Sequence, residues 1–156
     1  MRYITIAISL LLLVTLSAHK CNEKTAAAAG DGNPAVGMTK IPGIMDSKWV
    51  VRTIKGNVVT MPDKGGEAPW VRMLKEGNKV EGFGGCNSLM GGFRLSGEQI
   101  QFPNLGSTKK FCESTQSIEN GFMGALKATR KFKLDKAGLL HLTDDAGADL
   151  ATFTQE

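Results

Sequence analysis

GFGGCNSLMGGFRLSGEQIQFPNLGSTKKFC, residues 82–112, is the stretch of sequence on which the fold depends. Glycines at 82, 84, 85, 91 and 92 interrupt its short apolar runs, which indicates strand ends, tight turns and close backbone approach. Further along, Phe93-Arg94-Leu95 and Ile100-Gln101-Phe102 flank Ser96-Gly97-Glu98, the pattern of a β-hairpin. The stretch therefore predicts short antiparallel strands joined by turns.

Cys86 and Cys112, 26 positions apart, are predicted to form a disulfide that closes this stretch. In the loop-closure model such a bridge stabilises a domain by roughly 3–4 kcal/mol. The alternative is a pair of buried free thiols, and pairing requires that the chain leaves the reducing cytosol. A redox-active pair is disfavoured because the sequence has no C-x-x-C. His141 is the only histidine after residue 20, so neither a bound metal nor a cofactor is predicted.

Residues 1–20 are predicted to be a secretory signal peptide, because Arg2 precedes an apolar run, residues 4–18, that is too short to stay in a membrane. Cys21 follows, and residues 21–43 have the composition of a flexible tether. This layout is typical of a bacterial lipoprotein and predicts lipidation of Cys21 and an outer-membrane anchor. The usual Leu and small residue before that cysteine are replaced here, so ordinary cleavage near Ala18 is the alternative. Acylation would, however, occupy the odd cysteine.

Composition and charge indicate one ordinary globular domain. Apolar residues make up 42% of the chain and charged residues 22%. The part beyond the tether, about 110 residues, is long enough for a single core. The formal charge of +4 falls to +2 without residues 1–20, which hold Arg2, Lys20 and no acid. No concentrated basic face for nucleic acid is expected. Basic clusters at 109–110 and 127–133 are interpreted as solvated, with anionic lipid headgroups or envelope polymer as the alternative.

The rest of the domain, residues 44–156, predicts further strands and one helix. Strands are expected near 49–54, 70–75 and 79–83, with a hairpin turn at Glu76-Gly77-Asn78. After Cys112 the apolar period changes to that of a helix, and strands near 132–134, 139–143 and 150–153 follow. The predicted helix stripe is Ile118, Phe122, Ala125, Leu126 and Thr129. His141 is expected to be packed or on an edge strand, and residues 144–149 to form a turn rather than a calcium loop. The predicted fold class is α+β, mainly antiparallel β: a small, partly open barrel-like sheet with one helix packed against it.

Several of these residues occur in an order that resembles the META domain, the HslJ-like family of bacterial envelope proteins, over about residues 44–154. The matching order is Gly84-Gly85-Cys86-Asn87, Gly92-Phe93, residues 107–112, and then Glu119, Phe122 and Leu126. Ser88 and Lys110-Phe111 depart from the residues that the family often has there. The resemblance implies a periplasmic, non-catalytic domain that serves envelope stress tolerance, such as the heat-shock response, or interacts with exported proteins.

The sequence has no constellation of residues for catalysis, so an enzyme is not predicted. One alternative function is a carrier that binds a small apolar ligand or lipid inside the partly open barrel. Its cavity would be lined by Trp49, Trp70, Phe102 and Phe122. Another is a partner-binding domain that uses an exposed loop over Asn87, Ser88 and Met90. The expected partners are therefore the membrane, through the lipid anchor, and either envelope proteins or an apolar ligand.

Overall fold

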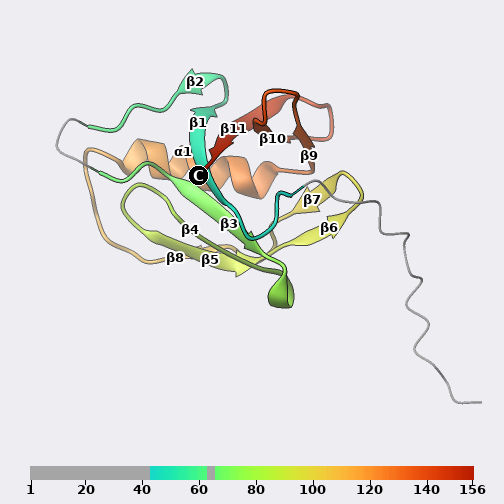
Figure 1. Cartoon of the computed structure of the whole chain (residues 1–156). Coiled ribbons are helices and arrows are strands. Elements are labelled where there is room, and N and C mark those ends of the chain that lie inside the picture. Colours follow the sequence, from blue (N-terminus) through green and yellow to red (C-terminus); the bar gives the residue numbers. More distant parts are fainter. Residues whose placement is uncertain (1–42, 63–65) are drawn as a thin grey trace, which may run out of the picture. The chain divides into compact units, whose positions relative to one another are not determined.

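A computed structural model describes residues 43–62 and 66–156 of the chain (Figure 1). The predicted signal peptide, Cys21 and almost all of the predicted tether lie outside these residues. The elements are β1 (Lys48–Ile54), β2 (Asn57–Val58), β3 (Trp70–Leu74), a 3-10 turn η1 (Glu76–Asn78), β4 (Lys79–Phe83), β5 (Ser88–Gly92), β6 (Arg94–Ser96), β7 (Gln99–Gln101), β8 (Gly106–Ser107), α1 (Gln116–Ala128), β9 (Lys131–Leu134), β10 (Leu140–Thr143) and β11 (Asp149–Gln155). None of the helices within these ranges has the length and apolar character needed to cross a membrane.

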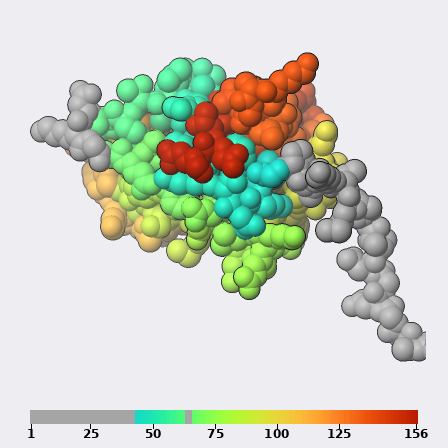
Figure 2. All heavy atoms as spheres, viewed as in Figure 1, coloured from blue at the N-terminus to red at the C-terminus, as the bar shows by residue number. Residues whose placement is uncertain are grey.

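The named strands form one curled antiparallel sheet, and α1 lies across one of its faces (Figure 1). The order is β6-β7-β9-β10-β11-β1-β3-β4-β5-β8, with β2 returning along β1. The last strand, β11, therefore lies in the middle of the sheet, where Trp49 pairs with Gln155. Figure 2 shows its red surface between the blue-green of β1 and the orange of the preceding strands. The predicted fold class is confirmed.

The core lies between the sheet and α1. Period-two alternation turns Trp49 of β1 and Val71 and Met73 of β3 inward, where each is at most 1% exposed. From the helix, Phe122 packs against Phe153 of β11 with their ring centroids 6.2 Å apart. These apolar contacts hold α1 on the sheet, which compensates for the glycines within the helix.

The structure corrects the prediction of an exposed loop over Asn87–Met90. Residues 88–92 form β5, which pairs with β4 on one side and β8 on the other. Only Leu89 of this strand points into the core, at 2% exposure. The strand was not predicted because Leu89 and Met90 are adjacent apolar residues among a serine and glycines and show no period-two alternation. The predicted turn between β3 and β4 is confirmed at η1.

Candidate functional site

The candidate site is built around the Cys86–Cys112 disulfide. The structure pairs these two cysteines, whose Cα atoms lie 6.0 Å apart, within the usual range for a bridge. Both residues are half-buried. The bridge joins the turn between β4 and β5 to the segment that leads into α1. It therefore confirms the predicted pairing over the free-thiol alternative.

Beside the bridge, the side chain of Asn87 is the centre of a buried hydrogen-bond network. Its Nδ2 donates to the carboxylate of Glu119 and to the backbone carbonyl of Lys110, each at 3.0 Å. Its Oδ1 accepts from the Thr108 hydroxyl at 2.8 Å and from the Lys110 N–H at 2.7 Å. The Asn87 side-chain amide thus bonds both the N–H and the C=O of Lys110, as the backbone of a neighbouring strand would. It thereby extends the contact between the β5 and β8 segments beyond Ser107.

Glu119 is the only charged member of this network that is buried, at 5% exposure. Its carboxylate accepts from the backbone N–H of Asn87 at 3.1 Å as well as from that residue's side chain. A buried carboxylate is costly unless such bonds replace water. The backbone at residue 84 also lies close to the Glu119 side chain, because a Cβ on Gly84 would be 2.8 Å from Cγ of Glu119. The next residue, Gly85, has a φ of +106°. This network therefore requires Gly84, and the backbone conformation of the turn favours glycine at 85.

β8 (Gly106–Ser107) is the last strand in the sheet order, and residues 108–111 continue the chain from it; we call residues 107–111 the β8 edge. The hydrogen bonds toward β5 fall on alternate residues: the N–H of Thr108 donates to the carbonyl of Ser88, and Lys110 bonds Asn87. The alternation of an antiparallel ladder turns the backbone groups of Lys109 and Phe111 the other way. No strand pairs with that side among the residues that the structure describes.

A groove of about 300 Å³ lies between the β8 edge and the first turns of α1. Phe111 lines it and is 80% exposed, which is unusual for a large apolar side chain. Lys109 and Lys110 also line the groove, and neither has an ion-pair partner within the described ranges. The groove thus combines free backbone groups, one exposed ring and two uncommitted cations.

The residues predicted to bind a partner lie in different environments. Asn87 is buried at 3%, whereas Ser88 is exposed and Met90 is 57% exposed on β5. The four aromatic residues that the carrier hypothesis places around one ligand do not all lie together. Trp49, Phe102 and Phe122 pack in the core.

Trp70 lies on the opposite face of the sheet from that core. It alternates along β3 with the buried Val71, so the two side chains point to opposite faces. On the outer face its ring lies between two cations, with Lys48 Nζ 5.4 Å and Arg72 Cζ 5.8 Å from the centroid. This half-buried ring is part of a polar outer surface.

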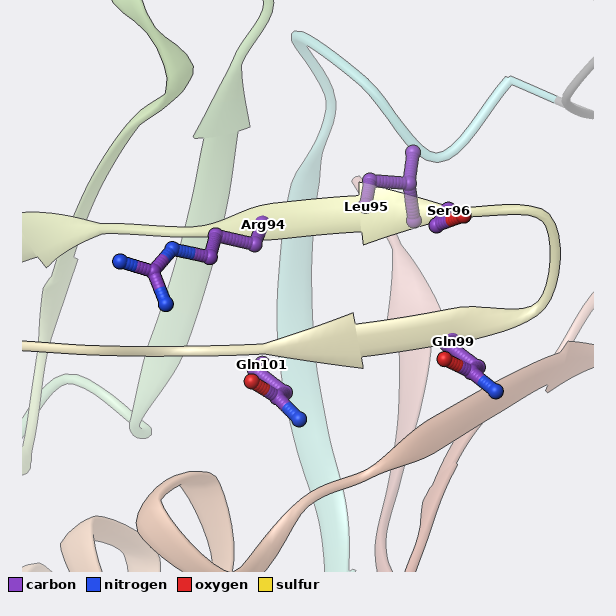
Figure 3. Close-up of a pocket in the computed structure, with 5 residues that line it drawn as sticks. All are labelled: Arg94, Leu95, Ser96, Gln99 and Gln101. Atoms are coloured by element: carbon purple, nitrogen blue, oxygen red, sulfur yellow. The ribbon is translucent and has the colours of Figure 1, made fainter. Parts of the chain in front are cut away.

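A second concave surface lies on the β6–β7 hairpin (Figure 3). Four exposed polar side chains form its outward face: Arg94, Ser96, Gln99 and Gln101. Arg94 is paired across the strands with Gln101, and Ser96 with Gln99. The intervening Ile100 is fully buried. We call these four residues the hairpin face. Sequence analysis placed the hairpin correctly but singled out none of these side chains.

His141 of β10 lies on the outer face of the sheet, where its side chain is 15% exposed and is flanked by the carboxylates of Asp135 and Asp149. Its Nε2 is 3.3 Å from Asp135 and its Nδ1 is 3.0 Å from Asp149. The pKa of Asp135 is lowered, mainly because the Leu139 N–H donates to its carboxylate and also because of His141. No group of three or more side chains suited to holding a metal ion occurs in the part of the chain that the structure describes.

The turn before β11 has the predicted structural role. The Asp144 carboxylate accepts from the backbone N–H of Ala148 at 2.9 Å, which closes the turn from β10. Such a local side-chain bond is typical of aspartate in turns. Turn chemistry thus explains Asp144, whereas the Asp149 carboxylate contacts His141 from the start of β11.

Comparison with known proteins places this geometry in a wider context. The sequence model of a family described as META domain matches residues 42–156. The chain is similar to an NMR structure of a protein from Burkholderia xenovorans, at 26% identity and a TM-score of 0.56, over 88% of this chain and 97% of that one. A second NMR structure, at 21% identity and a TM-score of 0.55, shares the fold over 71% of this chain and 90% of that one. No curated protein sequence matches the chain.

Proposed function

The chain belongs to the META domain family, and from this premise we propose that it is a non-catalytic module of the bacterial envelope that binds segments of other exported proteins. The observation that carries the proposal is the open β8 edge. Unpaired N–H and C=O groups along a strand edge are a template on which another extended chain can add as a further strand. Main-chain bonds would supply affinity at this edge.

The edge is held in place before any partner arrives. The disulfide fixes its end at Cys112, and the Asn87 amide holds Lys110 from the side. A preformed edge has less conformational freedom to lose on binding, which favours affinity. The buried bonds of Asn87 and Glu119 support a scaffolding role for the network, because their polar groups satisfy each other and do not face solvent.

The chemistry of the groove supports one kind of occupant. Lys109 and Lys110 complement carboxylates, and Phe111 offers an apolar contact. The proposed partner is therefore an extended segment of an exported polypeptide that carries acidic residues beside an apolar one. A second copy of this chain is a competing occupant, which the experiment below distinguishes.

The test uses a short peptide that alternates Val and Thr and carries Glu at both ends. Its binding is followed by amide chemical shifts and by hydrogen exchange of the residues of the β8 edge. Lys109→Pro removes the outward N–H while leaving an edge conformation that proline tolerates. We expect it to weaken binding about tenfold relative to Lys109→Ala, which lacks the charge but keeps the N–H.

Three outcomes would contradict the proposal. Equal affinity of Lys109→Pro and Lys109→Ala would show that the outward backbone group is not used. Self-association at the β8 edge that the peptide does not displace would identify a second copy as the occupant. Chemical shifts confined to another surface would also remove the edge from consideration.

We also propose that the module is exported and anchored at the outer membrane through lipid on Cys21, where it serves envelope stress tolerance. The apolar run of residues 4–18 followed by Cys21 supports this location. The intact mass of the mature protein from the membrane fraction of its host tests it: the expected mass is that of a diacylated chain beginning at Cys21. An unmodified chain beginning near residue 19 would contradict the anchor.

A complementation experiment tests the role in stress tolerance. Deleting the gene should lower tolerance of heat or drugs, and wild type should restore it whereas Lys109→Pro should not. Equal rescue by both would show that the β8 edge is not needed for stress tolerance.

A further inference from the structure

The hairpin face adjoins another concavity through Gln101, and three cations line the two: Arg94 in the first, and Lys127 and Arg130 in the second. One concavity, of about 190 Å³, is lined by the hairpin face and Leu95. The other, also about 190 Å³, shares Gln101 and adds Lys127 and Arg130 from the end of α1. The backbones are joined here, because the N–H of Ile100 donates to the carbonyl of Arg130 at 2.9 Å. No acidic side chain lines either concavity.

The polar groups of this surface are available to a ligand. Within the described part of the chain, the side chains of Arg94, Gln99 and Gln101 make no hydrogen bond or ion pair with other protein groups, and all three are exposed. Figure 3 shows the amide groups of Gln99 and Gln101 pointing the same way from β7. Arg130 is fixed, since its guanidinium donates to the carbonyls of Lys127 and Thr129.

This combination of side chains matches a sugar that carries a negative charge. A glutamine amide both donates and accepts, as adjacent hydroxyls of a sugar ring do, whereas guanidinium and ammonium groups only donate and favour an anion. A membrane-binding surface would protrude and expose apolar residues. Here the surface is hollow, and its largest apolar residue, Phe102, is 6% exposed.

We infer that the hairpin face, together with Lys127 and Arg130, is a binding site for an anionic oligosaccharide. The amides of Gln99 and Gln101 bond the sugar hydroxyls, and Arg94 with the two cations from the end of α1 binds its carboxylate or phosphate. The β8 edge lies at the other end of the strand order. The inference is therefore independent of the proposed function, and each can fail without the other.

The test follows the side-chain amide signals of Gln99 and Gln101 by NMR in the exported, disulfide-bonded chain. Trigalacturonic acid supplies sugar with carboxylates, maltotriose is an uncharged trisaccharide, and inorganic phosphate is an anion without sugar. We expect saturable shifts of both signals with trigalacturonic acid and at least about tenfold weaker binding of each of the other two.

Arg94→Gln is expected to weaken binding of trigalacturonic acid about tenfold, because a charge-assisted contact is lost from an exposed position. Lys136→Gln removes a charge from the exposed turn between β9 and β10 and should leave binding unchanged. Gln101→Ala removes the side chain that lines both concavities and should also weaken binding of trigalacturonic acid. Phosphate or maltotriose that bound as tightly as trigalacturonic acid would overturn the inference. So would wild-type affinity in both Arg94→Gln and Gln101→Ala.

Discussion

Replacing Asn87 by Ala should cost a large part of the stability of the domain. The substitution deletes an amide that bonds the Glu119 carboxylate, the Thr108 hydroxyl and both backbone groups of Lys110. It leaves Glu119, at 5% exposure, with one remaining donor, the backbone N–H of residue 87. The disulfide stays in place, so the change isolates the hydrogen-bond network.

The magnitude follows from the burial of each partner. A bond to the charged carboxylate contributes roughly 1.5–3 kcal/mol and a neutral bond roughly 1 kcal/mol. Thr108 and Lys110 are exposed, so water replaces part of what they lose. We therefore expect a loss of about 3–5 kcal/mol, against about 5–15 kcal/mol for the whole stability of a typical domain.

Urea unfolding with the bridge intact, followed by tryptophan fluorescence, measures this loss. The matched control is Asn120→Ala, because that exposed amide makes one 3.2 Å bond to Gln116 and should change stability by under about 0.5 kcal/mol. A loss below about 1 kcal/mol for Asn87→Ala would refute the reasoning. Asn87→Asp adds a second carboxylate beside Glu119, and its deficit should shrink as pH falls and the two carboxylates come to share a proton.

Three further predictions concern the bridge, one carboxylate and two glycines. Reducing the disulfide with dithiothreitol should remove about 3–4 kcal/mol, and an unchanged urea midpoint would contradict this. Because the pKa of Asp135 is lowered in the folded state, its stabilising contribution is present above the ordinary carboxyl pKa and is lost as pH falls through the lower value. The stability difference between wild type and Asp135→Asn should therefore shrink in acid, below about pH 4, and a difference independent of pH would exclude this role. Gly84→Ala should cost about 1–3 kcal/mol because its Cβ meets Glu119, whereas Gly124→Ala, with nothing within 4 Å, should gain up to about 1 kcal/mol; equal effects would argue against the close approach.

The helix, the β6–β7 hairpin and the disulfide could be predicted because each has a local signal. Apolar residues at helical spacing placed α1, and Ser96-Gly97-Glu98 between apolar pairs placed the hairpin turn. Cys86 and Cys112 lie within the glycine-rich stretch, and the predicted export of the chain favours their pairing. The helix and hairpin signals depend on residues close together in the sequence, so they do not require knowledge of which distant segments pack together.

Glu119 shows what the sequence alone did not reveal. Its place in the first turn of α1 suits the helix dipole, yet it shares the buried face with Phe122 and Leu126 at spacings of three and seven residues. An acid on the apolar stripe is a signal that could have indicated a buried partner. Trp70 shows a different limit, because alternation places it opposite Val71 without saying which of the two faces inward.

The central place of β11 has a consequence for when the domain can finish folding. Trp49 and Gln155 are neighbours in the sheet but about a hundred residues apart in the chain, so the middle of the sheet waits for the last strand to be made. A ribosome-bound chain that lacks this strand cannot complete the central ladder. A polypeptide built this way acquires its finished shape only after the whole domain has been synthesised.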